Sequence, residues 1–368
     1  MPLTRDVILD ALRTVDDPDL KRDLVSLNMV KDIDIQPDQV NITIELTTPA
    51  CPMKDRIQSD IQAAVTSRAR ESGEANLNVN VTFTANVKAK TPQDQANENS
   101  PLPGVRHIVA VGAGKGGVGK STVAVNLAVG LARLGARTGL LDGDIYGPSA
   151  PTMLGLASER PRMRDEQTML PFEKHGIRSM SIGKLVPTDK ALIWRGPMAH
   201  GAFRQLALQT EWGELDYLIV DLPPGTGDVP LSLCQMLPLS GAVVVCTPQI
   251  VAQDDARRAV RMFQQLGVDV LGVVENMSYF VGNDGVTYDL FGKGGAEALA
   301  AEMNLPFLGA VPIHTCLRRN GDEGTPLKNW TDSNDLAREL DAVCQAVAQQ
   351  VSINTSSGKL IQPTLSIR

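Results

Sequence analysis

Short, almost continuous apolar runs alternate with helical segments through the last two-thirds of the chain. Such a run suits a strand that is buried on both faces of a parallel sheet, and the intervening helices suit right-handed crossovers. This pattern predicts an α/β fold with a doubly wound, mostly parallel sheet. The predicted strands cover residues 107–113, 137–142, 216–223, 241–248, 270–276 and 306–312.

The N-terminal part follows a different pattern. Apolar residues at helical spacing predict one helix over 4–15 and a second over 52–72, which begins with a proline. Strict alternation of apolar and polar residues predicts strands over 40–48 and 77–85. We therefore expect a small α+β domain over residues 1–85.

A polar stretch separates the two patterns. Residues 86–104 contain three prolines and no apolar period, which indicates a linker. The alternative is a long surface loop within one domain. The second domain is then expected over 105–353, and the polar residues 354–368 predict a flexible tail.

Composition narrows the class of protein. The chain has 368 residues, of which 43% are apolar, enough for two cores. Its net charge of −7 argues against a non-specific nucleic-acid binder, because no basic surplus exists to neutralise phosphates. We expect no nucleic acid among its partners.

The cysteines and the lengths of the apolar runs indicate the cellular compartment of the protein. The five cysteines are scattered and form no CxxC, which argues against a disulfide framework and favours a reducing compartment. The N-terminus lacks the apolar run of a signal peptide, and no uncharged apolar run reaches about 18 residues. We expect a cytoplasmic protein without a membrane partner.

One motif points directly to chemistry. Residues 114–121 read G-x-x-x-x-G-K-S, between a predicted buried strand and a predicted helix. In that setting the loop and helix N–H groups bind phosphates, Lys120 reaches the β- and γ-phosphates, and Ser121 holds Mg²⁺. ATP and Mg²⁺ are the expected cofactors. The predicted nucleotide-binding residues are Gly114, Lys115, Gly116, Gly117, Val118, Gly119, Lys120, Ser121 and Thr122.

A second lysine, Lys115, stands at the start of this loop. The form G-K-G-G-x-G-K-S resembles the deviant Walker A loop of the P-loop ATPase branch that includes partition, arsenite-pump and nitrogenase-reductase proteins. In that branch the early lysine reaches the nucleotide of a second subunit. The resemblance therefore implies a homodimer with Lys115, Lys120 and Asp144 as catalytic residues, whereas a merely solvated Lys115 is the alternative.

Four acidic or amide residues match this branch. Asp142 ends the predicted strand 137–142, and Asp144 follows it by two residues. Asp221 comes directly after four apolar residues. The resemblance implies that Asp144 orients the attacking water, and that Ser121, Asp142 and Asp221 bind Mg²⁺, partly through water. Asn276 ends another predicted strand and matches an amide that reads the adenine edge; an ordinary loop asparagine is the alternative.

The motifs together resemble the Mrp/ApbC family of iron–sulfur cluster carriers. They include "GKGGVGKST", "LLDGDIYGPSAPTMLGL", "LDYLIVDLPPGTGDVPLSL" and "ENMSYF", and they span residues 105–328. The N-terminal unit, with "LTTPACPMKDRI", resembles the iron–sulfur assembly domain often fused to these ATPases. The resemblance implies an ATPase that transfers iron–sulfur clusters, with apoproteins or assembly scaffold proteins as partners.

The chain departs from that family at the cluster site. Where the family has V-C-P-x-C-G after "ENMSYF", this chain has Gly282 and Gly285, which offer no thiolate. The Gly-Asn-Asp-Gly run predicts a turn instead. Cys51, at a predicted helix start, is the candidate cluster thiol, although a buried structural role is equally open for it. Cys316 is the second candidate. The other three cysteines are expected in cores.

Two other functions remain open at this stage. One is a cluster-free ATPase switch of the partition or positioning type, whose output is a partner interaction. The other is a regulatory paralogue that binds ATP and acts through its N-terminal domain. Iron content after anaerobic reconstitution would separate cluster transfer from both.

Overall fold

The computed structural model describes residues 3–18, 22–36, 38–46, 54–71, 77–85, 100–184, 196–282 and 284–356. The chain divides into two compact units, which we describe separately: one contains the elements from α1 to β5, the other those from β6 onward. Cys51 and most of the predicted linker and tail lie outside the described residues. The domain boundaries proposed above remain predictions.

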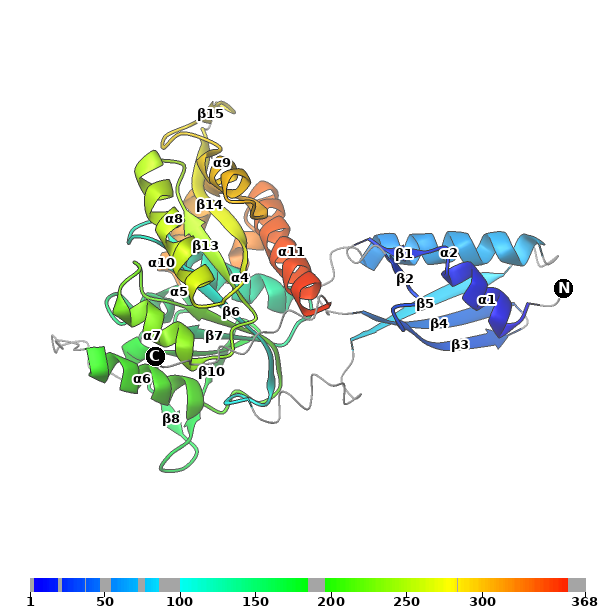
Figure 1. Ribbon diagram of the computed structural model, residues 1–368, viewed down its shortest axis with the longest axis horizontal. Helices are drawn as coiled ribbons and strands as arrows, with labels where there is room; N and C mark the ends of the chain where they lie inside the picture. Colours follow the sequence, from blue (N-terminus) through cyan, green and yellow to red (C-terminus); the bar gives the residue numbers. More distant parts are fainter. Residues whose placement is uncertain are drawn as a thin grey trace. The chain divides into compact units, whose positions relative to one another are not determined.

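The first unit is a three-stranded sheet with helices on one face (Figure 1). Both predicted helices and both predicted strands are present, and Ile8, Ile42 and Ile61 are among the fully buried core residues. A further strand, β3, pairs antiparallel with β4. Sequence patterning missed β3 because Ile33 is its only deeply buried residue. The elements are α1 (Arg5–Leu12), β1 (Asp16–Asp17), β2 (Arg22–Asp23), β3 (Val30–Gln36), β4 (Gln39–Leu46), α2 (Lys54–Glu71) and β5 (Asn78–Ala85).

The second unit is built on a nine-stranded sheet, counted over the described residues, that is parallel except at β10 and β15. Its order is β10-β11-β7-β12-β6-β13-β14-β15, with β16 also paired to β14. The predicted mostly parallel α/β fold is confirmed. The strands of this sheet are β6 (Val105–Gly112), β7 (Thr138–Asp142), β10 (Phe172–Lys174), β11 (Ile177–Ser181), β12 (Leu215–Asp221), β13 (Gly241–Cys246), β14 (Val270–Val281), β15 (Thr287–Tyr288) and β16 (Phe307–Ile313).

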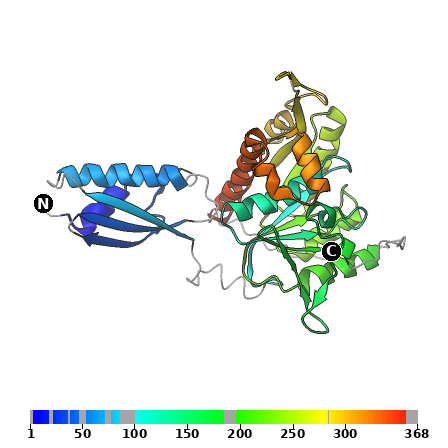
Figure 2. The same cartoon turned by 180° about the vertical axis from the view of Figure 1, so that it is seen from behind.

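Helices cover both faces of this sheet, as the apolar runs require. In Figure 1, α6, α7 and α8 lie in front of the sheet, and Figure 2 shows α4, α10 and α11 on the opposite face. No helix among the described segments is long and apolar enough to cross a bilayer. The helices are α4 (Lys120–Arg133), α5 (Ala150–Met153), α6 (Gly196–Leu208), α7 (Asp228–Met236), α8 (Ile250–Gln265), α9 (Gly295–Glu302), α10 (Thr315–Asp322) and α11 (Asn334–Ser356).

Two local features differ from the sequence expectation. The strand predicted to end at Asn276 continues to Val281, because the chain resumes pairing with β15 and β16 after an irregularity at Met277, whose φ is 56°. Strands β10 and β11 were not predicted; only β11 joins β7 in the parallel sheet. Short elements complete the unit: β8 (Arg162–Met163), β9 (Met169–Leu170), η1 (Ile182–Lys184) and η2 (Pro326–Trp330).

Candidate functional site

The phosphate loop joins β6, a central strand, to the start of α4. The neighbours of β6 are β12 and β13, so the loop lies where the strand order changes direction, the usual ligand position of doubly wound sheets. Glycine is required at two places in the loop by close approach. A Cβ on Gly114 would lie 2.0 Å from the carbonyl oxygen of Asp255, and one on Gly119 would lie 2.0 Å from Asn276 Nδ2.

We expect Gly114→Ala to destabilise the second unit by about 1–3 kcal/mol, the usual cost of forced overpacking. The reason is that backbone, not a flexible side chain, occupies the position of the added methyl. Gly116→Ala is the matched control, since its nearest neighbour, Pro224 Cγ, lies 3.9 Å away. Thermal unfolding without nucleotide measures both variants, and equal melting temperatures would contradict this reading of the loop.

Lys120 is buried among acidic groups from two neighbouring strand ends. Its Nζ lies 2.5 Å from Asp221 Oδ1 and 3.3 Å from Asp144 Oδ2, and all three side chains are at least nine-tenths buried. β7 and β12 are parallel neighbours with Asp142 opposite Asp221, which brings the predicted acidic residues together. The carboxylates of Asp144 and Asp221 therefore neutralise the Lys120 ammonium within the chain.

Asp144 and Asp142 hold the loop after β7. Asp144 Oδ1 accepts hydrogen bonds from the N–H groups of Tyr146 and Gly147. Asp142 Oδ1 accepts from the N–H of Asp144, and its Oδ2 accepts from Ser181 Oγ at 2.8 Å and from the N–H of Ala150. Both oxygens of Asp142 are thus engaged with the chain.

Asp142 is fully buried, and its pKa reflects that position. Burial, followed by the charge of the nearby Asp221, raises the pKa of Asp142 to about 7. Burial also raises the pKa of Asp221, against the opposing effect of the Lys120 ammonium. A buried carboxyl that bonds the loop through both oxygens is suited to positioning Asp144 rather than to contacting a metal directly.

A divalent cation fits beside Asp221 and Ser121. The Oδ2 atom of Asp221 is buried and has no hydrogen-bond partner among the described residues. The Ser121 hydroxyl lies 3.3 Å from Lys120 Nζ. Carboxylate, hydroxyl and water oxygens are the ligands that Mg²⁺ prefers, so an unpartnered carboxylate oxygen near a hydroxyl fits this ion.

Asn276 contacts the phosphate loop itself. Its Nδ2 donates to the Val118 carbonyl oxygen at 2.8 Å, and its side chain is buried. In this structure, therefore, the amide braces the loop from β14. The contact of Asn276 with adenine, which the resemblance implies, stays a prediction. It would require the hydrogen bond between Asn276 Nδ2 and the Val118 carbonyl oxygen to change.

Lys115 stands apart from the other charged residues of the loop. It is half-buried and makes no hydrogen bond or ion pair with any described residue. By contrast, Lys120, only five residues away, bonds two carboxylates. The two lysines of the loop thus face different surroundings.

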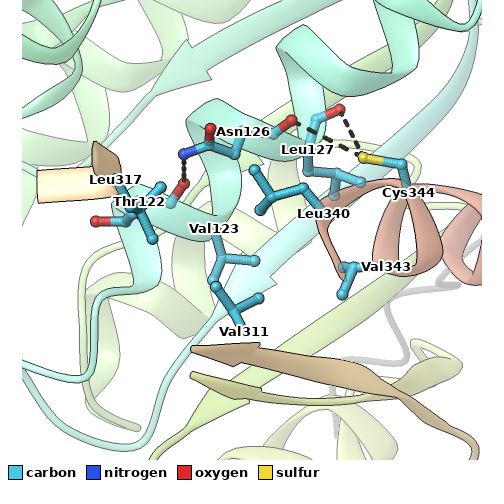
Figure 3. A pocket seen from close by; sticks show the side chains of 9 residues that line it. All are labelled: Thr122, Val123, Asn126, Leu127, Val311, Leu317, Leu340, Val343 and Cys344. Atoms are coloured by element: carbon cyan, nitrogen blue, oxygen red, sulfur yellow. Dashed lines mark hydrogen bonds between the residues drawn. The ribbon is translucent and has the colours of Figure 1, made fainter. Parts of the chain in front are cut away.

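Sequence reasoning missed one support of the loop helix. Asn126 interrupts an apolar helical run, which is the signal that could have revealed it. Its Nδ2 donates to the Thr122 carbonyl oxygen, and its Oδ1 accepts from Asn329 Nδ2 at 2.7 Å. Figure 3 shows Asn126 beside a small, mostly apolar pocket between α4, β16, α10 and α11. These buried amides tie the start of α4 to η2.

Comparison with known families agrees with this geometry. Residues 104–348 match the family described as NUBPL iron-transfer P-loop NTPase, and residues 5–81 match the family described as iron–sulfur cluster assembly protein. The chain belongs to this iron-transfer P-loop NTPase family. The resemblance inferred from the motifs is thereby confirmed.

Individual relatives match over nearly their whole length. The chain is 48% identical to the iron-sulfur cluster carrier protein of Synechocystis over 95% of this chain and 99% of the relative. It is also 48% identical to that of Deinococcus radiodurans, over 96% and 97%. A nucleotide-binding protein from Archaeoglobus fulgidus, solved with ADP, superposes with a TM-score of 0.56 at 38% identity, covering 63% of this chain and 92% of that one.

The hairpin that contains Gly282 and Gly285 is a tight turn. The N–H of Gly285 donates to the Gly282 carbonyl oxygen at 2.9 Å, and the N–H of Gly282 donates to the Val286 carbonyl oxygen. The predicted turn is therefore present. Among the described residues, no group of three or more His, Cys, Asp or Glu side chains is arranged to hold a metal ion.

The described cysteines occupy different environments. Cys234, Cys246 and Cys344 are buried in α7, β13 and α11, as expected of core residues, whereas Cys316 is partly exposed at the start of α10. Burial raises the pKa of Cys234 and of Cys246 to about 12 and raises that of Cys344 as well. The three buried thiols are thus protected from reagents both by their burial and by their protonated state.

Thiol labelling checks this placement. We expect iodoacetamide at pH 8 to modify Cys316 in the native protein while Cys234, Cys246 and Cys344 react only after urea unfolding. Mass spectrometry of tryptic peptides measures each site separately, and the urea-unfolded sample is the control for intrinsic reactivity. Native labelling of Cys246 as fast as that of Cys316 would contradict the buried strand assignment.

Proposed function

We propose that this protein is a homodimeric, Mg²⁺-dependent ATPase that hydrolyses ATP and uses the cycle to bind and transfer iron–sulfur clusters to apoproteins. The observation that carries the proposal is the group formed by Lys120, Asp144 and Asp221, next to an unpartnered carboxylate oxygen. This is the charge arrangement that a P-loop needs to exchange for Mg·ATP. The carrier names of its relatives supply the cargo.

Each residue of the site has a part in the proposed hydrolysis. ATP binding draws Lys120 from the carboxylates to the β- and γ-phosphates. Ser121 and Asp221 would hold Mg²⁺, which would neutralise phosphate charge. Asp144, released from Lys120, orients the water that attacks the γ-phosphorus as the bond to the β,γ-bridging oxygen breaks, giving ADP and phosphate. Asp142 keeps the Asp144 loop in place.

Lys115 acts in this proposal on the nucleotide of the second subunit. Its lack of any described partner supports that role, because this half-buried ammonium beside its own phosphate loop has no counter-ion among the described residues. Facing the partner's triphosphate, it would offset the charge that develops in phosphoryl transfer. Dimerisation would thereby complete two active sites at once.

Cluster binding in this proposal does not use the hairpin positions 282 and 285. Cys51, which lies outside the described residues, is the candidate thiol, and two copies in a dimer would need an outside thiol to complete the coordination of a labile cluster. The second candidate function, a cluster-free ATPase switch, is favoured by the glycine hairpin and by the lack of a metal-binding group among the described residues.

One experiment separates the two candidates. The full chain is reconstituted anaerobically with ferrous iron and sulfide, and iron and labile sulfide are counted per dimer alongside ATP hydrolysis. Substoichiometric iron that falls in Cys51→Ser, with hydrolysis retained, supports cluster transfer. Hydrolysis without any iron supports the switch, and a protein that neither hydrolyses ATP nor binds iron overturns both.

A further inference from the structure

Three buried asparagines form a network of hydrogen bonds beside the helix that follows the phosphate loop. Asn126 belongs to α4, Asn320 to α10 and Asn329 to η2, and none of them is more than 3% exposed. Asn329 Nδ2 donates to Asn126 Oδ1 at 2.7 Å, and Asn320 Nδ2 donates to Asn329 Oδ1 at 3.0 Å. A buried amide is costly unless its polar atoms are paired, so this asparagine network holds the three elements in one arrangement.

One end of the asparagine network lies at the phosphate-loop end of α4. Asn126 Nδ2 donates to the Thr122 carbonyl oxygen at 2.8 Å, as Figure 3 shows. Thr122 follows Lys120 and Ser121, the residues proposed to bind the phosphates and Mg²⁺, in the first turn of the helix. Because a hydrogen-bonded helix moves as a rigid body over so few residues, a shift of Asn126 also shifts Lys120 and Ser121.

The other end of the network reaches the segment that carries Asp144. The loop with Asp144 joins β7 to α5, and the N–H of Ala150, the first residue of α5, donates to Asp142 Oδ2. A Cβ on Gly324, just after α10, would lie 2.3 Å from the Cα of Gly155, just after α5. The backbones at the ends of α10 and α5 are therefore in direct contact.

Further hydrogen bonds hold residues 315–330, which contain α10 and η2, together as one bridging segment. The N–H of Thr325, between the two elements, donates to the Asn320 carbonyl oxygen at 2.8 Å. Asn320 Nδ2 also donates to Asp332 Oδ2 at 3.3 Å, and the Arg319 guanidinium donates to the same oxygen at 2.7 Å. The bridging segment thus contacts α4 at one place and the end of α5 at another.

We propose that Asn329 is a positioning residue for ATP hydrolysis. Through Asn126 it fixes α4 against the bridging segment, which packs on the end of α5. It thereby sets the position of Lys120 relative to Asp144. The inference rests on the hydrolysis proposed above, in which Lys120 binds the phosphates and Asp144 orients the attacking water. Small misplacements of reacting groups lower turnover far more than binding, because alignment is needed chiefly in the transition state.

The test is a double-mutant cycle on turnover. Asn329→Ala and Asn126→Ala each remove the hydrogen bond between the two side chains, one from η2 and the other from α4. We expect each to lower kcat for Mg·ATP hydrolysis at least about tenfold, while the Kd of a non-hydrolysable ATP analogue changes by less than about threefold. The double variant should lose little more than the more affected single variant, because both substitutions act through one bond.

A loss of stability is measured separately from a loss of turnover. All variants of the full chain are assayed well below their own melting temperatures, where a lower stability alone leaves kcat unchanged. Thr210→Val is the matched control, since it removes another buried hydrogen bond of the second unit, from Thr210 Oγ1 to the Leu206 carbonyl oxygen at 2.6 Å. We expect this control to lower the melting temperature and to retain kcat.

The outcomes separate the inference from the function on which it rests. If the unaltered chain hydrolyses ATP and the folded Asn329→Ala or Asn126→Ala variant keeps its kcat, the inference fails alone. It also fails alone if the two losses of kcat multiply in the double variant, because the residues then act separately, or if ATP affinity falls while kcat is retained. An unaltered chain that does not hydrolyse ATP overturns the proposed function together with the inference.

Discussion

Replacing Lys120 with methionine will remove most of the affinity for Mg·ATP. The ammonium is the buried positive charge at the end of the phosphate loop, and two carboxylates already compete for it at 2.5 and 3.3 Å. Losing one partner of a buried, hydrogen-bonded charge pair costs about 2–5 kcal/mol, which corresponds to a loss of at least about 30-fold in affinity. Equilibrium titration with a fluorescent ATP analogue measures it.

A loss of folding must be separated from a loss of binding in this variant. Lys120→Met leaves Asp221 and Asp144 buried without their cation, which destabilises the protein. Lys120→Met combined with Asp221→Asn removes one of the stranded charges, so we expect it to regain stability without regaining binding. Near-normal ATP affinity in the single variant would contradict the assignment of Lys120.

Lys115→Ala will leave ATP binding nearly unchanged and reduce turnover by about a thousandfold. The expected magnitude is that of a charge supplied from a partner in phosphoryl transfer, which contributes about 10³–10⁵ in kcat. Lys115 has no described partner within its own chain, so its removal should cost little stability. Steady-state kinetics would show kcat falling with KM retained, and Lys328→Ala, an exposed lysine, is the control.

Mixing two inactive variants tests whether Lys115 acts across the dimer. In a heterodimer of Lys115→Ala and Asp144→Ala chains, one site combines its own Asp144 with the partner's intact Lys115, and the other site lacks both. An equal mixture should then recover roughly a quarter of the normal activity, since half of the dimers formed at random hold one complete site. If activity does not recover although the subunits exchange fully, Lys115 acts on the nucleotide of its own subunit.

Much of the fold followed from local patterns. The unbroken apolar runs marked the six central parallel strands, because strands buried on both faces need apolar residues at every position. The loop motif identified the phosphate site, since its glycines and terminal lysine act within eight consecutive residues. Strands β3 and β10 escaped because edge strands keep polar residues on their exposed positions, and the internal strand β11 escaped because its sequence, IRSMS, contains no continuous apolar run.

The electrostatics of the site depended on contacts that no local pattern contains. The motif predicted Lys120 and Asp221 separately, but only the parallel pairing of β7 and β12 brings Asp144 and Asp221 to one lysine. The same holds for Asn276, which braces Val118 across 158 positions of the chain.

By itself, the sequence predicted which residues carry the chemistry, because motifs and periodicity are properties of neighbouring residues. Only the tertiary structure decided which of those residues touch. It showed that Asp142 serves its loop, that Lys115 lacks a described partner, and that the glycine hairpin presents apolar side chains. The physical reason is that burial and charge pairing arise between segments that are distant in the chain and become neighbours only when the sheet assembles.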